Sequence, residues 1–231
     1  MEELRGLRVP FLKVGWNRQF LMMKEFGFLY DSSIVAPFTQ VPLWPYTLDY
    51  KIPHKCLGDN HCPSRSYPGV WEMVMNQLEA EDGRTCVYAD QCPSNLNADD
   101  IYQMFMHNFK RHYSTSRAPL GLYFHSGWFR RNDYLEVFVK FLQFLEKLPD
   151  VYFVTNNQAI EWMKDPTPIS ELKNFKPFMC PEKDLEPHER SCTFANSCKL
   201  NSRVLQQDRY LITCNPCPNQ YPWVRNEFGL E

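Results

Sequence analysis

Apolar side chains recur at helical spacing in two long stretches, and each stretch predicts an amphipathic helix. Between residues 17 and 27, Phe20, Met23 and Phe26 share one face, and Gly27 ends the pattern. The second stretch carries the longer apolar stripe, which consists of Leu135, Phe138, Phe141, Leu142, Leu145 and Leu148.

Short apolar runs alternate with predicted helices between residues 97 and 164. The runs 120–125 and 151–155 predict buried strands, and further helices are predicted to begin near Asn97 and Gln158. Strands that alternate with helices through short links are typical of parallel βαβ units. The sequence therefore predicts an α/β fold.

The remaining segments of the first two-thirds are less regular. Residues 28–30 predict a short strand that reaches Asp31, whereas residues 70–78 fit a strand and a helix equally well. Residues 37–68 are rich in Pro, Trp, Tyr and Cys and predict a long irregular loop, and loops of that length are usually functional.

Composition narrows the class of protein. A net charge of −2 gives no basic surface for nucleic acid or an anionic membrane, and no apolar run reaches the roughly 20 residues of a membrane helix. The chain has nine cysteines, a number typical of an oxidising compartment, and the odd count leaves one without a partner. The first residues do not resemble a signal peptide, and disulfide-type cysteines without one suggest a fragment of a secreted protein.

The chain is predicted to divide near Pro166. Residues 1–166 carry the α/β pattern, and residues 167–231 are a Cys- and Pro-rich extension stapled by disulfides and packed on the main domain. The pair Cys214 and Cys217 has the spacing of zinc ligands, but structural disulfides are the favoured interpretation because other cysteines lie nearby.

A few side chains are candidates for catalysis or for binding a substrate. His125 ends a predicted buried strand, where α/β folds place their active sites, although it could equally be a histidine satisfied by local hydrogen bonds. Arg8 could orient a carboxylate, and Asp31 ends a short strand, yet such residues are more often ion-pair and turn residues. Trp44 and Trp128 could stack on sugars or fill the core.

Several stretches taken together resemble the insect chitin deacetylases, members of the polysaccharide deacetylase family. The similarity runs in order along essentially the whole chain, and its clearest segments are residues 8–15, 30–37, 42–47, 70–76, 117–125 and 151–155.

The resemblance implies a secreted, monomeric hydrolase that removes N-acetyl groups from chitin on a distorted, incomplete (β/α) barrel. In the family, a zinc ion held by one Asp and two His polarises the amide and activates water, a second Asp is the general base, and a His protonates the departing amine.

The resemblance also implies roles for four residues around the reacting atoms. His125 corresponds to the proton donor, and Arg8 to the arginine that positions the base. The backbone N–H of Phe11 would face the oxyanion. Asp31 would pair with the catalytic histidine, although Asp-Ser-Ser-Ile departs here from the wider family's Asp-x-x-Asp-Trp pattern.

Three more residues are expected to contact substrate. Leu122 would help to form the pocket for the acetyl methyl group, Trp44 would be an aromatic wall of the cleft, and Trp128 would also bind sugar.

The family's zinc ligands and general base are expected in motifs well before Arg8, and only seven residues precede it here. The chain is therefore predicted to be a fragment of a chitin deacetylase, inactive alone and without metal ligands of its own. The alternatives are a catalytically dead chitin-binding remnant that uses Trp44 and Trp128, and an interaction protein with a zinc knuckle in its tail.

Overall fold

The computed structural model describes residues 4–57, 61–92, 96–179 and 192–230. It divides into two compact units, Met1–Met179 and Cys180–Glu231. The predicted boundary near residue 166 lies inside the first unit, between the helix α4 (Asn156–Lys164) and the 3-10 helix η4 (Ile169–Asn174).

A small mixed sheet lies in the first unit. The strands β1 (Gly6–Leu7), β2 (Tyr30–Asp31) and β4 (Trp71–Glu72) run parallel, and β3 (Tyr46–Thr47) pairs with β4 in the antiparallel direction. The order across the sheet is β1-β2-β4-β3. Residues 70–78, for which the sequence left helix and strand open, contain β4 and the start of the hairpin strand β5 (Leu78–Glu79).

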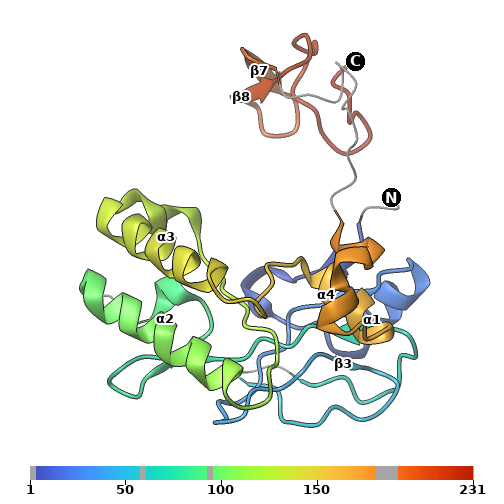
Figure 1. The fold of residues 1–231 in the computed structure, drawn as a ribbon. Coiled ribbons are helices and arrows are strands. Elements are labelled where there is room, and N and C mark those ends of the chain that lie inside the picture. Colours follow the sequence, from blue (N-terminus) through green and yellow to red (C-terminus); the bar gives the residue numbers. More distant parts are fainter. Residues whose placement is uncertain (1–3, 58–60, 93–95, 180–191, 231) are drawn as a thin grey trace. The chain divides into compact units, whose positions relative to one another are not determined.

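Four helices confirm the predicted helical segments: α1 (Trp16–Glu25), α2 (Ala98–Tyr113), α3 (Asn132–Glu146) and α4 (Figure 1). Asn97 caps α2 in a reciprocal pair with Asp100, so two otherwise unpaired N–H groups are satisfied at its start. Thr155 and Gln158 cap α4 in the same way. The short 3-10 helices η1 (Pro10–Leu12), η2 (Ala89–Gln91), η3 (Ser126–Arg130) and η5 (Lys176–Phe178) complete the helical elements.

Two predicted strands are not formed as strands. Residues 120–125 and 151–155 have no strand pairing among the described residues. The side chains of the second segment were expected to be buried, but Phe153 is 60% exposed, and Tyr152 and Val154 are exposed as well. These apolar side chains are partly exposed, and no described strand pairs with their segment.

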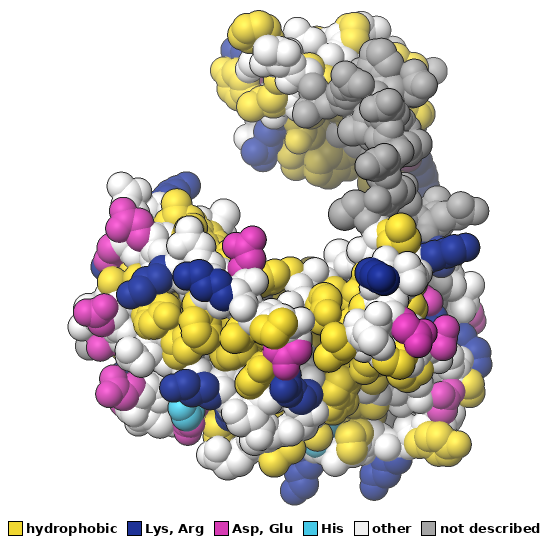
Figure 2. Space-filling view, viewed as in Figure 1, with side chains coloured by type: hydrophobic (Ala, Val, Ile, Leu, Met, Phe, Trp, Pro, Cys, Tyr) yellow, Lys and Arg dark blue, Asp and Glu magenta, His cyan; other side chains and the backbone are white. Residues whose placement is uncertain are grey.

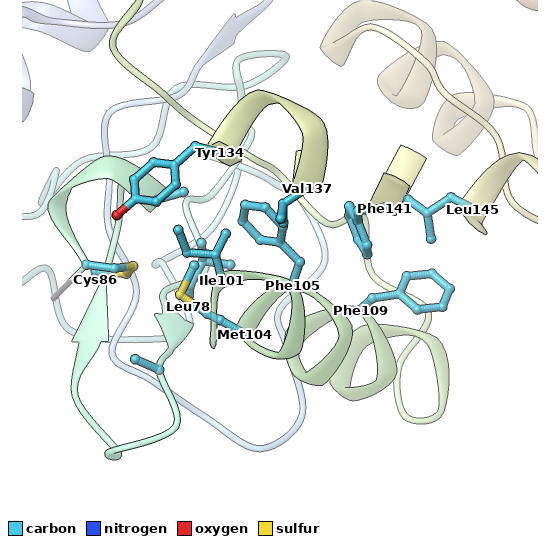
Figure 3. Packing of buried hydrophobic residues seen from close by; sticks show 13 residues of the cluster. Leu78, Cys86, Ile101, Met104, Phe105, Phe109, Tyr134, Val137, Phe141 and Leu145 are labelled. Carbon is cyan, nitrogen blue, oxygen red and sulfur yellow. A yellow bond between two sulfur atoms is a disulfide. The ribbon is translucent and has the colours of Figure 1, made fainter. Parts of the chain in front are cut away.

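The main core packs α2 against α3. Phe105 of α2 is fully buried and contacts Phe141 of α3, with the ring centroids 5.3 Å apart (Figure 3). Phe124, within the apolar run 120–125, and Trp128, just after it, pack edge-on or tilted against the same Phe105 ring. The core therefore fixes the chain on both sides of His125.

The second unit is a hairpin held by disulfides. The strands β7 (Asn196–Ser202) and β8 (Gln207–Thr213) pair in the antiparallel direction. Cys192 bonds to Cys214, and Cys198 bonds to Cys217, so these four sulfurs are not available as zinc ligands. The preferred disulfide interpretation of the tail is thereby confirmed.

The first unit has two disulfides, Cys56–Cys62 and Cys86–Cys92. The ninth cysteine, Cys180, lies outside the described residues. In the described part of the chain, none of the helices combines the length and the apolar character that crossing a bilayer requires.

Replacement of Phe105 by Ala tests the importance of the α2–α3 core. We expect the free energy of unfolding to fall by about 3–5 kcal/mol, because the change empties the centre of a packed aromatic cluster. Phe26, which is 66% exposed at the end of α1, offers a matched control, and Phe26→Ala should change stability by less than about 0.5 kcal/mol. Equal losses in urea denaturation for the two variants would contradict this assignment of the core.

Candidate functional site

His125 pairs with Asp90. The Nδ1 atom of the ring lies 2.7 Å from Asp90 Oδ2, and the histidine side chain is 64% exposed while that of the aspartate is 14% exposed. No described residue bonds to Nε2 of the same ring. The site therefore has a histidine held at one nitrogen and accessible to solvent on its other side.

Alternate side chains of residues 120–124 face in different directions. Leu122 and Phe124 pack against the α2–α3 core, and Gly121 and Tyr123 line a pocket of about 220 Å³, while Leu120 contacts both. This alternation is that of an extended segment, even though no ladder is formed. The walls of the pocket also include Met73, Val74, Tyr152, Phe153 and Val154.

Arg8 lies over Tyr123, two residues before the histidine. The guanidinium carbon is 4.2 Å from the ring centroid, which is cation–π distance. Arg8 Nε donates to the carbonyl oxygen of Ser32, and Nη2 donates to Ser32 Oγ, both at 2.7 Å. The Tyr123 ring occupies the space that a Cβ at Gly121 would need, so glycine at that position permits this packing.

Asp31 and Glu72 form a fully buried pair of carboxyl groups in the small sheet. They are register partners on β2 and β4, and both are 0% exposed. Asp31 accepts hydrogen bonds from Gln19 Nε2 at 2.7 Å and from the N–H and Oγ of Ser33, both at 2.8 Å.

The protonation of this pair follows from its surroundings. Burial, and then the neighbouring charge of Asp31, raise the pKa of Glu72 well above its ordinary value. Burial also raises the pKa of Asp31, but the hydrogen bonds from Glu72, Ser33 and Gln19 oppose that rise. Glu72 Oε2 has no described partner that donates to it. This fits a protonated Glu72 that donates to an ionised Asp31.

Asp31 and His125, which were expected to act together, have different described partners. Asp31 was expected beside the catalytic histidine, but its oxygens are occupied by Gln19, Ser33 and Glu72, and the carboxylate beside His125 is that of Asp90.

Phe11 lies in a backbone conformation that L-residues rarely adopt. Its φ is 57°, and Leu12 follows with φ 53°, within the left-handed region that favours glycine. The Phe11 side chain is 96% exposed, and the Val9 N–H donates to Ser33 Oγ at 3.0 Å. Such strain at two consecutive residues is typical of functional loops.

The three predicted substrate-contacting residues are all engaged in packing. Leu122 and Trp128 pack against the α2–α3 core. Trp44 stacks on Trp162, with centroids 6.1 Å apart, and donates from Nε1 to the Ser116 carbonyl oxygen at 2.8 Å. Their roles in binding sugar stay predictions.

A zinc ion does not fit the described residues. Within the described ranges, no three His, Cys, Asp or Glu side chains come together as a metal site. His125 contacts one carboxylate, and the Asp31–Glu72 pair is fully buried, with a raised pKa for Glu72 that opposes the ionised form a zinc ligand needs. No step of the chemistry is assigned to a metal on these residues.

No role was predicted from the sequence for Asp90, Glu72 or Tyr123. Asp90 lies between Cys86 and Cys92, and a short loop closed by two cysteines was a signal that could have directed attention to it. Glu72 is an acid within an apolar run, which often marks a buried partner for another polar group.

Comparison with known proteins finds close relatives but no matching family model. Chitin deacetylase 1 of Bombyx mori is 42% identical over 235 residues, which cover 97% of this chain and 43% of that protein. Chitin deacetylase 8 of Bombyx mori is 30% identical over 236 residues, which cover 98% of this chain and 58% of that protein. The chain thus spans about half the length of these relatives.

The buried pair predicts a specific dependence of stability on pH. A raised folded pKa means that the native state holds a proton that the unfolded state releases above pH 4.5, so the contribution of Glu72 to stability declines as the pH rises from there. Glu72→Gln keeps a donor towards Asp31 and an acceptor for the Ile34 N–H but cannot ionise. We expect the stability of this variant relative to the parent to increase steadily above pH 4.5.

Urea denaturation between pH 4 and pH 8 measures this difference. Glu81→Gln removes an exposed acid from the same segment and should follow the parent at every pH. A Glu72→Gln curve parallel to that of the parent would contradict the buried, protonated state of Glu72.

Proposed function

Because this chain is a homologue of the chitin deacetylases of Bombyx mori along nearly all of its length, we propose that it supplies the proton-donor side of a chitin N-deacetylase site. The observation that carries the proposal is His125, whose ring is held through Nδ1 by Asp90 while Nε2 is left without a described partner.

The reaction is the hydrolysis of an N-acetyl amide. The carbon–nitrogen bond breaks, the oxygen of water bonds to the acetyl carbon, and acetate and a free amine on the sugar are the products. The departing nitrogen needs a proton, since an amide anion is a very poor leaving group. His125 donates this proton from Nε2.

Arg8 and Phe11 act beside the histidine in this proposal. Arg8 is held by Ser32 and Tyr123, so its guanidinium is fixed for orienting a carboxylate. The strained backbone at Phe11 presents its N–H to the oxygen of the substrate carbonyl. Asp31 acts on Arg8 only through Ser32, the next residue in the chain, which accepts hydrogen bonds from the guanidinium.

The substrate and the compartment follow from the same homology. Chitin or chito-oligosaccharide is the proposed substrate, with Leu122, Trp44 and Trp128 contributing to its cleft. The four disulfides support an extracellular, oxidising environment. The three parallel strands and the extended residues 120–124 support membership of a (β/α) barrel of the polysaccharide deacetylase type.

A chitin-binding protein without activity is the alternative function. It would hold sugar through Trp44, Trp128 and the loops of the cleft, as the deacetylase would, but it would leave the pairing of His125 with Asp90 without a role. No described feature favours it over the deacetylase proposal.

A chimera provides the activity test. The 231 residues would replace the aligned region of Bombyx mori Chitin deacetylase 1, and acetate release from chito-oligosaccharide would be measured. We expect the chimera to release acetate and the isolated chain to release none, with or without added zinc, since its described residues form no metal site. An inactive chimera that folds correctly would contradict the proposed function.

His125→Ala in the chimera should lower turnover by roughly 10²-fold or more, the usual scale for losing a positioned acid. His107→Ala is the matched control, because His107 is also exposed and also pairs with a carboxylate, Glu79, at 2.8 Å. Equal turnover in the two variants would contradict the role of His125.

A further inference from the structure

We propose that Asp90, carried on the loop closed by the Cys86–Cys92 disulfide, is the positioning residue that orients His125 for proton transfer. This inference rests on the proposed function and assigns to Asp90 the part that the family resemblance had suggested for Asp31.

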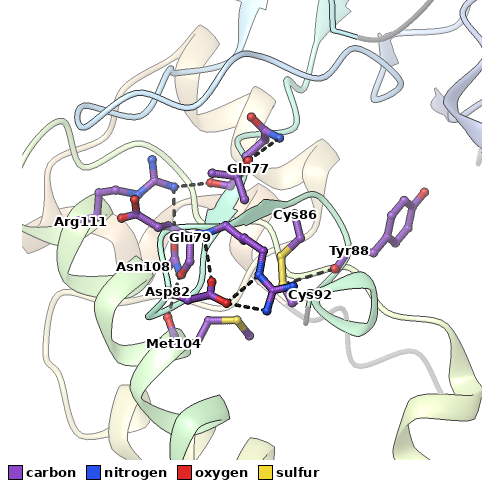
Figure 4. Close-up of a disulfide and its surroundings, with 11 residues drawn as sticks. Gln77, Glu79, Asp82, Cys86, Tyr88, Cys92, Met104, Asn108 and Arg111 are labelled. Atoms are coloured by element: carbon purple, nitrogen blue, oxygen red, sulfur yellow. Dashed lines mark hydrogen bonds and ion pairs between the residues drawn. A yellow bond between two sulfur atoms is a disulfide. The ribbon is translucent and has the colours of Figure 1, made fainter. Parts of the chain in front are cut away.

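The disulfide closes a short loop directly after a hairpin. Cys86 ends β6 (Thr85–Cys86), which pairs with β5, and Cys92 follows η2, the 3-10 turn that contains Asp90. Both cysteines are buried, and Cys92 Sγ contacts the Tyr88 carbonyl oxygen across the loop (Figure 4). The disulfide thus joins the two ends of the loop covalently, and one of its buried sulfur atoms also contacts the backbone of the loop.

The loop is fastened to the segment that carries the histidine. The N–H of Ala89 donates to the carbonyl oxygen of Tyr123 at 2.9 Å, and Ala89 is buried. The Tyr88 ring lies against the His125 ring, with centroids 5.0 Å apart and planes inclined by 30°. Tyr88 and Asp90, the residues on either side of Ala89, therefore both contact His125.

Asp90 has an unusual hydrogen-bonding pattern for a carboxylate. Its Oδ2 bonds to His125 Nδ1, while Oδ1 is buried and has no hydrogen-bond partner in the described part of the chain. A buried oxygen without a donor costs stability, on the order of 1–3 kcal/mol. A carboxylate kept at such a cost, with a histidine as its described partner, is typical of a functional site rather than of a structural one.

Asp31 is not available for this role. It is fully buried, accepts hydrogen bonds from Gln19 and Ser33, and lies opposite Glu72 in the sheet. It stabilises the packing of β2 against β4, whereas Asp90 lies beside the exposed ring.

The contact determines which nitrogen reacts. A carboxylate at Nδ1 retains the proton on that nitrogen and directs Nε2 away from the loop. When the amide bond breaks, the imidazolium gives its Nε2 proton to the departing nitrogen and becomes the neutral ring with its proton on Nδ1, still bonded to Asp90. His107 provides an internal contrast, because its carboxylate, Glu79, bonds to Nε2 instead.

The tautomer of His125 tests the contact on the 231-residue chain itself. Nitrogen-15 shifts of the imidazole rings, recorded at a pH where the rings are neutral, should show the proton of His125 mainly on Nδ1. In Asp90→Ala this preference should be lost, while the His107 signals and the backbone amide spectrum stay unchanged. A His125 ring that is protonated mainly on Nε2 in the parent chain would overturn the proposal.

Kinetics of the chimera test the consequence. Asp90→Ala should lower kcat by roughly 10–100-fold, as is usual when the group that orients a functional histidine is removed, with little change in KM. Glu79→Ala, which removes the carboxylate beside His107, should leave both constants unchanged.

The two readouts separate this inference from the proposed function. A chimera without activity would contradict the deacetylase proposal, and the tautomer would still decide whether Asp90 orients His125. An active chimera in which Asp90→Ala retains full kcat would overturn the positioning role while leaving the proposed function intact.

Discussion

The burial of aromatic side chains between α2 and α3 is the constraint on which the site depends. Phe105 and Phe141 form its centre, and Phe124 and Trp128 are drawn onto it from either side of His125. With its neighbours held in the core, the histidine is left at the surface of the first unit. Hydrophobic side chains also gather on the visible face of that unit (Figure 2), as expected where apolar segments have few partners.

Two polar networks in the first unit have different surroundings and different proposed roles. Asp31 and Glu72 lie buried on adjacent strands, where burial raises the pKa of Glu72, and Ser32, next to Asp31, accepts two hydrogen bonds from Arg8. Asp90 reaches His125 from a loop closed by a disulfide. The Asp31–Glu72 network is fully buried and joins adjacent strands. In the other network the His125 ring is exposed to solvent, where a substrate can approach.

Much of the fold could be predicted because its signals are local. Helical periodicity and capping residues such as Asn97 located the four α-helices of the described residues, and the spacing of the cysteines indicated disulfides. The strands at residues 120–125 and 151–155 could not be predicted correctly, since an apolar run forms a strand only when a neighbouring strand completes its hydrogen bonds. No local pattern reports whether that neighbour is present.

Local signals also account for the residues of the candidate site that could be named from the sequence. His125 and Arg8 stand in recognisable motifs, but the choice between Asp31 and Asp90 depends on contacts between segments 35 residues apart, which spacing along the chain does not encode. The most direct test of the account is a crystal structure of the chimera with a bound chito-oligosaccharide. The account predicts His125 Nε2 at about 3 Å from an acetamido nitrogen, with Nδ1 still on Asp90. An oligosaccharide bound with no acetamido nitrogen within reach of His125 would contradict it.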